Sequence, residues 1–365
     1  MAKAKPPILE IGVGYGILAA GLGQLSDGHG WAKEPSDMRE PLIKALKGAK
    51  RRFYDKSGTG RTAADVMKTV EKWDYSDLAY SREGFKCYWE LLEEVQRYQS
   101  DMMADGRDVI QYLTSFFPEG KYLKDLNGLV IGCTYGEHAP ANSLAKTGAF
   151  HRLSVVDISD GLLKRQKELT RKLGLERVIK YKRMDLNMES IKEADRYDLI
   201  LGVGTIHHIE RLEGLFSEIN NALGEDGIFC MREYVGPSRL QFTDKQINLC
   251  NRVLQGLPDD LKKGQDGRIK DEVLRPPVEE VIADDPSEAV RSEDIMGVGG
   301  RYLQALACNW TGGTLLHPLL DGIAGNFEGG DSERAVLKGL IVLERVLIEE
   351  GVIPSDYVFF VGKSI

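Results

Sequence analysis

The sequence predicts a doubly wound α/β fold, in which a mostly parallel sheet carries helices on both faces. Two observations predict it. Short apolar strand patterns alternate with helical patterns from residue 126 to about residue 235. The first of these strands runs into the turn Gly132-Cys-Thr-Tyr-Gly136, and the second ends in Asp157. A strand, a glycine turn, a helix and a second strand ending in a carboxylate form a nucleoside-binding unit.

Each element of this core follows from its residue pattern. Strands are expected at residues 129–131, 154–156, 178–183, 197–201 and 227–234, and helices at residues 139–147, 161–173 and 212–223. Gly224 ends the last of these helices, because glycine favours the position that follows a helix. Alternation of this kind predicts parallel strands joined by crossover helices.

The alternation stops after residue 235 and returns near the end of the chain. Residues 236–300 contain several prolines and a charged segment, so we expect an insertion over the carboxyl edge of the sheet. A strand near residues 302–310, a helix at 333–349 and a last strand at 357–361 follow. The loop before the last strand is too short for a parallel crossover, and that strand is therefore expected to be antiparallel.

The segments before residue 126 are predicted to be additions to the core. Apolar residues at helical spacing in residues 85–98 and 109–117 predict a helical cover over part of the cleft. A second glycine-rich run, residues 9–16, lacks a following strand with a terminal acid, so we interpret it as a packing unit. The expected division is an extension at 1–60, a cover at 61–125, a core at 126–235, an insertion at 236–300 and core-completing elements at 301–365.

Composition excludes several classes of protein. The chain has 365 residues, 42% hydrophobic and 28% charged, as in ordinary globular proteins. A net charge of -8 argues against a nucleic-acid backbone or an anionic membrane as a partner. Five dispersed cysteines without a CxxC pair argue against a disulfide framework and a structural zinc site, so no metal is expected. Without a convincing signal peptide, we expect a cytoplasmic protein.

The glycine turn and two carboxylates indicate the type of cofactor. Gly132 allows a tight turn, Gly136 permits close approach of a ligand, and Asp157 can accept hydrogen bonds from both hydroxyls of a ribose. A dinucleotide site would favour glycine where this chain has Thr134 and Glu137, and a carboxylate there would repel a pyrophosphate. S-adenosylmethionine fits better, because it has a ribose, no phosphate and a cationic end.

These motifs, with Asp185 and the segment 197–208, resemble those of the class I S-adenosylmethionine-dependent methyltransferases. The resemblance covers roughly residues 126–235 and implies a seven-stranded, Rossmann-like sheet. Val130 and Thr134 depart from the usual acidic residue and glycine of the first motif. The cofactor-binding residues that we infer are Gly132, Cys133, Thr134, Gly136, Glu137, Asp157, Ile158, Asp185, Leu186, Val203 and Gly204. Asp185 would reach the adenine amino group, and Leu186 would contact the ring.

The sequence also offers candidates for catalysis and for substrate binding. Methyl transfer from a sulfonium is an in-line displacement that a general base can assist. His208, and with less support His207, follow the fourth strand, while Glu233 at the end of the fifth strand is a competing base. Tyr234, Arg239 and Arg291 are candidate substrate-binding residues, although both arginines could instead anchor the insertion through ion pairs.

Segments 233–239, 285–292, 312–317 and 354–356 resemble a bacterial methyltransferase subgroup whose members often act on small molecules or sugars. We therefore expect methyl transfer to an oxygen or nitrogen of a small molecule, with S-adenosylmethionine as the cofactor. Two alternatives stay open, because a fold does not determine a reaction. One is another chemistry on the same fold, such as cyclisation or elimination, and the other is a non-catalytic regulator that holds the cofactor. A homodimer is compatible with the sequence.

Overall fold

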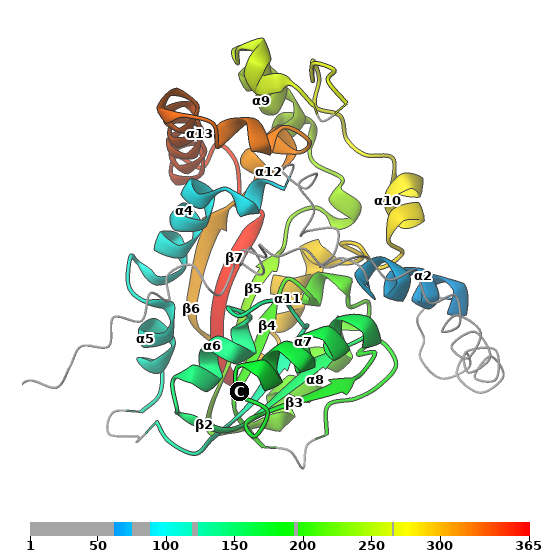
Figure 1. Ribbon diagram of the computed structural model, residues 1–365, viewed down its shortest axis with the longest axis vertical. Coiled ribbons are helices and arrows are strands. Elements are labelled where there is room, and N and C mark those ends of the chain that lie inside the picture. Colours follow the sequence, from blue (N-terminus) through cyan, green and yellow to red (C-terminus); the bar gives the residue numbers. More distant parts are fainter. Residues whose placement is uncertain (1–61, 75–87, 119–122, 193–195, 265) are drawn as a thin grey trace, which may run out of the picture.

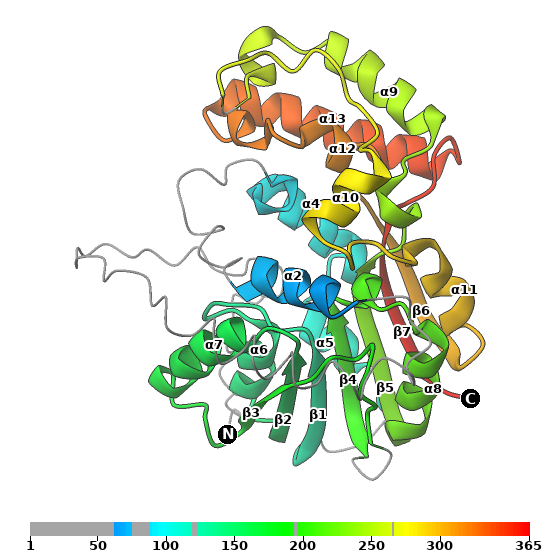
Figure 2. The same cartoon turned by 90° about the vertical axis from the view of Figure 1, so that its right-hand side faces the viewer.

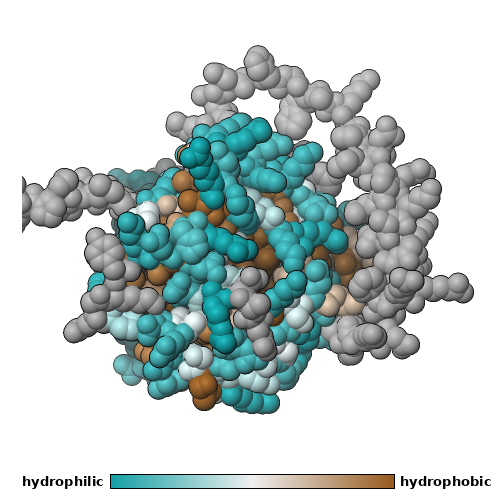
Figure 3. All heavy atoms as spheres, turned by 90° about the horizontal axis from the view of Figure 1, so that it is seen from below, coloured by the Kyte–Doolittle hydropathy of each residue, from teal (hydrophilic) through white to brown (hydrophobic). Residues whose placement is uncertain are grey.

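The computed structural model describes residues 62–74, 88–118, 123–192, 196–264 and 266–365. Two interpretations made from the sequence fall outside these residues, namely the extension at 1–60 and the glycine-rich run at 9–16. Within the described part of the chain, none of the helices combines the length and the apolar character needed to cross a membrane. Hydrophilic residues predominate on the face seen from below, with hydrophobic residues between them (Figure 3).

A seven-stranded sheet forms the centre of the fold, with the strand order β3-β2-β1-β4-β5-β7-β6 (Figure 1). The strands are β1 (Leu126–Ile131), β2 (Phe150–Asp157), β3 (Ile179–Arg183), β4 (Tyr197–Val203), β5 (Leu223–Tyr234), β6 (Leu303–Gly312) and β7 (Tyr357–Ser364). The first five strands pair in parallel, and β7 is antiparallel to both of its neighbours. The predicted doubly wound sheet with an antiparallel last strand is confirmed.

Helices cover both faces of this sheet (Figure 2). On one face, α8 (Leu212–Ala222) and the short α11 (Ile295–Gly299) contribute buried residues such as Phe216 to the core. On the other face lie α5 (Val109–Thr114), α6 (Pro140–Lys146) and α7 (Asp160–Lys172). The side chain of Ser159 caps α7 by accepting a hydrogen bond from the backbone N–H of Leu162.

The N-terminal helices divide between two places. Helix α2 (Ala63–Asp74) packs against α7, whereas α4 (Glu93–Ala104) packs against β6 and α13 (Asp331–Glu349). The helix expected at residues 85–98 is confirmed from Glu93 onward, within α4, but is wrong before it, where a short 3-10 turn, η3 (Trp89–Leu91), comes first. The reason is Leu92, whose extended backbone (φ −66°, ψ 127°) interrupts the helical path.

The insertion after β5 adds helices beyond the carboxyl edge of the sheet. Its elements are η5 (Ser238–Leu240), α9 (Asp244–Gln255), η6 (Asp259–Lys262), α10 (Val278–Asp284), η7 (Ser292–Asp294) and α11. Residues from α9 join α12 (Leu316–Leu320), η8 (Ala324–Phe327) and α13 in a second hydrophobic core. The strand order contains no strand from residues 236–300, in agreement with the prediction of an insertion.

Gly132 ties the end of β1 to the segment after β4. Its φ is +94°, a left-handed conformation that side chains disfavour. A Cβ atom at this position would lie 2.0 Å from Thr205 Oγ1. Gly148 also has a positive φ, +73°, but nothing lies within 4 Å of its Cβ position. A substitution at Gly148 therefore tests backbone strain alone, whereas a substitution at Gly132 tests strain and steric overlap together.

We predict that Gly132→Ala lowers the free energy of unfolding by about 3 kcal/mol, because positive-φ strain and overlap with Thr205 act together. Gly148→Ala, the matched control, should cost only about 1 kcal/mol from strain alone. Denaturant unfolding measures both, and Thr205→Ala should rescue part of the loss at Gly132. Equal losses in the two single variants would contradict this account.

Candidate functional site

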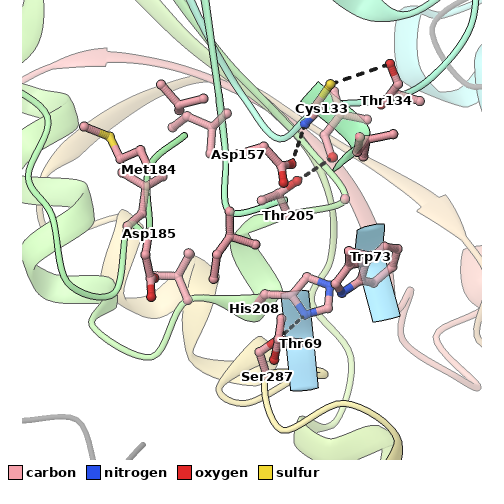
Figure 4. Close-up of a pocket in the computed structure, with 18 of the residues that line it drawn as sticks. Thr69, Trp73, Cys133, Thr134, Asp157, Met184, Asp185, Thr205, His208 and Ser287 are labelled. Atoms are coloured by element: carbon pink, nitrogen blue, oxygen red, sulfur yellow. Dashed lines mark hydrogen bonds between the residues drawn. The ribbon is translucent and has the colours of Figure 1, made fainter. Parts of the chain in front are cut away.

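A cavity of about 220 Å³ lies at the carboxyl ends of β1, β2 and β4 (Figure 4). Cofactor candidates that line it are Cys133, Thr134, Asp157, Ile158, Asp185, Leu186, Val203 and Gly204. Parallel strands place their carboxyl ends at one edge of the sheet, which is why residues far apart in sequence meet there. The cavity therefore brings together most of the residues predicted to hold the cofactor.

Three predicted cofactor residues do not line this cavity: Gly132, Gly136 and Glu137. Gly132 lies against Thr205 instead. The backbone of Gly136 is already paired, because its N–H donates to Gln166 Oε1 at 2.8 Å and its carbonyl accepts from Asn142 Nδ2 at 3.0 Å. Gly136 therefore shapes the turn, and the exposed Glu137 follows it.

Asp157 presents its carboxylate to the cavity from the end of β2. One carboxylate oxygen accepts from the backbone N–H of Cys133 and the other from that of Ser159, both at 2.7 Å. Each oxygen keeps a further lone pair, so the carboxylate can still accept both hydroxyls of a ribose. Burial raises the pKa of Asp157 to about 6, although these two hydrogen bonds partly oppose the rise.

The rest of the lining suits an adenine ring. Apolar side chains gather beside Asp157, contributed by Ile158, Leu162, Met184, Leu186 and Ile209. The carboxylate of Asp185 stands at the same wall, where it accepts from the backbone N–H of Asn187 at 2.9 Å and keeps acceptor capacity for an amino group. An apolar cavity lining that also contains the carboxylates of Asp157 and Asp185 thus suits the adenosyl part of the cofactor predicted from the sequence.

Glu233 lies away from the cavity and holds His207. The Glu233 side chain is 0% exposed and accepts from His207 Nδ1 at 2.7 Å. It also accepts from the backbone N–H groups of Thr205, Ile206 and Tyr234. Burial alone would lower the pKa of His207, but attraction to Glu233 outweighs it and raises this pKa to about 9. The Glu233 carboxylate is therefore committed to protein donors.

The neighbouring His208 lines the cavity itself. Its ring centroid lies 4.1 Å from that of His207, and its Nδ1 lies 2.9 Å from Ser287 Oγ. Burial and the positive charge of His207 lower the pKa of His208 to about 3. Near neutral pH the pair therefore carries one positive charge, which lies on His207, the ring that does not line the cavity.

The predicted substrate-binding residues lie outside the cavity lining. Arg291 donates two hydrogen bonds to Glu213, at 2.8 and 2.9 Å, and pairs with Asp294. Arg239 donates to the backbone carbonyls of Pro286 and Glu288, each at 2.9 Å. Arg291 thus anchors the insertion through ion pairs, the alternative that the sequence left open, whereas Arg239 holds it through hydrogen bonds to backbone carbonyls. Tyr234 is 3% exposed and donates its hydroxyl to the carbonyl of Pro237.

One group of side chains in the described part of the chain could offer ligands to a metal. Atoms of His207, His208 and Glu288 lie within 4.8 Å of one another. However, His207 sits between two carboxylates, with Glu233 at 2.7 Å and Glu288 at 3.7 Å. A protonated imidazole has no lone pair for a metal, so we interpret this group as a cluster of ion pairs. That no metal takes part stays a prediction.

Sequence reasoning missed eleven residues that line the cavity, among them Thr69 and Trp73 of α2, Thr205 and Ser287. Val66, Thr69, Val70 and Trp73 do follow helical spacing, so the helix itself could have been found. Nothing in that spacing distinguishes a cavity wall from an ordinary packing face.

Comparisons with known proteins agree with the cofactor motifs. Residues 129–231 match the family model described as a methyltransferase domain. No curated protein sequence matches the chain.

Several solved structures resemble it distantly. Phosphoethanolamine N-methyltransferase 2 of Haemonchus contortus, solved with S-adenosyl-L-methionine, is 15% identical over 87% of this chain and 59% of its own, with a TM-score of 0.43. An O-methyltransferase of a Brevibacillus brevis multienzyme is 15% identical over 84% and 80%, with a TM-score of 0.39. The [4+2]-cyclase SpnF is 12% identical over 83% and 96%, with a TM-score of 0.44. These TM-scores are too low to support an inference about function.

We predict that S-adenosylhomocysteine binds with a pH dependence set by Asp157. Ribose hydroxyls donate to the ionised carboxylate, so protons compete with the ligand below the pKa of about 6. Affinity should be constant from pH 7 to 8 and fall by roughly tenfold per pH unit well below 6. Isothermal titration calorimetry measures this dependence.

Asp157→Asn should weaken binding by about 1–3 kcal/mol at pH 7.5 and flatten the pH profile. Asp160→Asn, on the exposed first turn of α7, is the control and should change neither. A wild-type affinity that is constant down to pH 5 would contradict the role given to Asp157.

Proposed function

We propose that this chain, which carries a methyltransferase domain of the class I S-adenosylmethionine-dependent superfamily, transfers a methyl group to an oxygen or nitrogen of a small molecule. S-adenosylmethionine is the cofactor of this domain. When bound, it supplies an electrophilic methyl group on a sulfonium. The protein then has to orient the acceptor, exclude water and take up its proton.

The observation that carries the proposal is the buried carboxylate–histidine pair of Glu233 and His207. His207 precedes the cavity residue His208 in the sequence. Glu233 holds His207 through its Nδ1–H, so Nε2 is the atom that accepts a proton once the ring is deprotonated. The ion pair raises the pKa of His207 to about 9, so its neutral form is a stronger base than free histidine. His207 is the proposed general base, and Glu233 is its positioning residue.

His208 has a different role in this proposal. It lines the cofactor cavity, and its lowered pKa keeps the ring neutral at physiological pH. A second positive charge beside a sulfonium would oppose cofactor binding. A neutral His208 avoids that repulsion. The sequence had favoured His208 as the base over His207, and the hydrogen bond from His207 to Glu233 now favours the reverse assignment.

The remaining expectations from the sequence stay predictions. These are the cytoplasmic location, the homodimer, the lack of a nucleic-acid or membrane partner, and substrate contacts through Tyr234, Arg239 or Arg291. Other chemistry on the same fold and a purely regulatory role also stay open. The buried His207–Glu233 pair favours catalysis over regulation, because a protein that only binds the cofactor has no use for a strengthened base.

We predict that His207→Gln lowers the rate of methyl transfer by about 10²–10⁴-fold, because the general base is lost. S-adenosylhomocysteine affinity should stay within about threefold of wild type, since His207 does not line the cavity. Labelled S-adenosylmethionine and a panel of hydroxyl and amine acceptors provide the measurement. His138→Gln, at an exposed position, is the control and should retain full activity.

An acceptor that is cyclised or undergoes elimination while the labelled cofactor stays intact would point to other chemistry on the same fold. Tight binding without any turnover would point to a regulator. Either outcome would contradict methyl transfer as the function.

We predict that kcat rises with pH until His207 is deprotonated. The pKa of about 9 applies to the cofactor-free protein, and the sulfonium charge should lower it in the complex. In Glu233→Gln the stabilising negative charge is gone, so the apparent pKa should fall by at least about 1 unit while the limiting kcat also falls. Measuring kcat from pH 6 to 10 tests both statements. A profile that is unchanged in Glu233→Gln would exclude the pair as the base.

A further inference from the structure

The C-terminal half of helix α2 is fastened over the cofactor cavity on two sides. At its C-terminal end, Asp74 accepts hydrogen bonds from Ser159 Oγ and from the backbone N–H of Gly161, at the start of α7. On the side of the insertion, Lys72 pairs with Asp284. Thr69 and Trp73 of the same helix line the cavity (Figure 4). Helix α2 therefore lies between α7 and α10, as Figure 2 also shows, and its Thr69 and Trp73 form part of the cavity wall.

Asp285 of the insertion holds the middle of this helix. Its side chain is 0% exposed, and its carboxylate accepts from Thr69 Oγ1 at 2.9 Å and from Trp73 Nε1 at 2.8 Å. A buried carboxylate needs donors in place of water, and α2 supplies two of them. Undocking of α2 would remove both, so the charge of Asp285 favours the closed position.

The same carboxylate also reaches His208, through Ser287. Asp285 Oδ1 accepts from the backbone N–H of Ser287 at 2.8 Å and from its hydroxyl at 2.7 Å. Burial would raise the pKa of Asp285, but the nearby His208 and these hydrogen bonds hold it below its usual range. Asp285 is therefore ionised and can only accept hydrogen bonds.

This direction of donation fixes the tautomer of His208. Because the Ser287 hydroxyl proton points to Asp285, Ser287 Oγ must accept from His208 Nδ1, 2.9 Å away. His208 then carries its proton on Nδ1 and leaves Nε2 as an acceptor. The edge of the His208 ring also contacts Trp73, with ring centroids 5.3 Å apart. The ring is thus held by Ser287 on one side and by α2 on another.

We propose that Asp285 is a positioning residue with two arms: it fastens α2 over the bound cofactor through Thr69 and Trp73, and it fixes the tautomer of His208 through Ser287. Asp285 thereby contributes both to the closure of the cavity and to the orientation of the His208 ring. The proposal rests on the proposed function in placing His208 beside the reacting methyl group. Neither arm requires knowledge of the acceptor.

The first arm is tested by the rate at which S-adenosylhomocysteine leaves the full-length protein, measured by stopped-flow displacement. Thr69→Val removes one donor and retains the shape of the side chain, and Trp73→Phe removes the other donor with a smaller ring, so release should become about 10-fold faster in each. Asp285→Asn should accelerate it more, because an amide cannot accept at both positions. Glu71→Gln, at an exposed position of α2, is the control and should stay within twofold of wild type.

The second arm is tested by nitrogen chemical shifts in protein labelled with ¹⁵N-histidine, with His208→Gln to assign the signal. Wild type should show the Nδ1–H tautomer at His208. Ser287→Ala and Asp285→Asn should convert it to a mixture, whereas Thr69→Val should leave it unchanged. Thermal unfolding of each variant identifies any general loss of structure.

An unchanged release rate in Asp285→Asn, or an unchanged tautomer of His208 in the same folded variant, would overturn the proposal. Both readouts use S-adenosylhomocysteine and involve no methyl transfer. Their outcomes therefore do not depend on whether any acceptor is methylated. The assays with a panel of acceptors test the proposed function separately.

Discussion

The arrangement of the site depends on the buried carboxylate of Glu233. Removing an ionised carboxylate from water costs several kcal/mol unless donors replace the lost hydration. Four donors do so here: the imidazole of His207 and the backbone N–H groups of Thr205, Ile206 and Tyr234. Thr205 and Ile206 lie just after β4, so the Glu233 carboxylate fixes the turn that contains the cavity residue Thr205. The Glu233 carboxylate thus holds residues of the site in place although it does not line the cavity.

Two adjacent histidines acquire opposite properties from their partners. His207 meets a carboxylate directly at 2.7 Å and is held protonated, whereas His208 hydrogen-bonds the Ser287 hydroxyl and lies farther, at 3.7 Å, from the carboxylate of Asp285. A hydroxyl relays a hydrogen bond but carries no charge, so it fixes the His208 ring without making it cationic. The protonation of His207 then opposes a second charge 4.1 Å away. The neutral ring faces the cavity in which a cationic cofactor binds.

Much of the core could be predicted from the sequence, because strands buried on both faces are short, apolar and regularly separated by amphipathic helices. The role of Asp157 followed from its place at the end of such a strand. The contacts of Asp285 could not be predicted, because its partner Thr69 is 216 residues away and lies on a helix with an ordinary amphipathic pattern. Glu233 was chosen for its position at a strand end, but only the structure reveals that its oxygens are already occupied.

Side chains of the insertion contact both imidazoles, and Arg239 holds the segment of the insertion that carries these side chains. Within four residues, Asp285 binds α2, Ser287 binds His208, and Glu288 faces His207 at 3.7 Å. Arg239 donates to the carbonyls of Pro286 and Glu288, and its own N–H donates to the carbonyl of Ala289, so the segment keeps its three side chains directed at three partners. The doubly wound core therefore defines the cofactor cavity, while this fastened loop defines the protonation and orientation of the groups beside it.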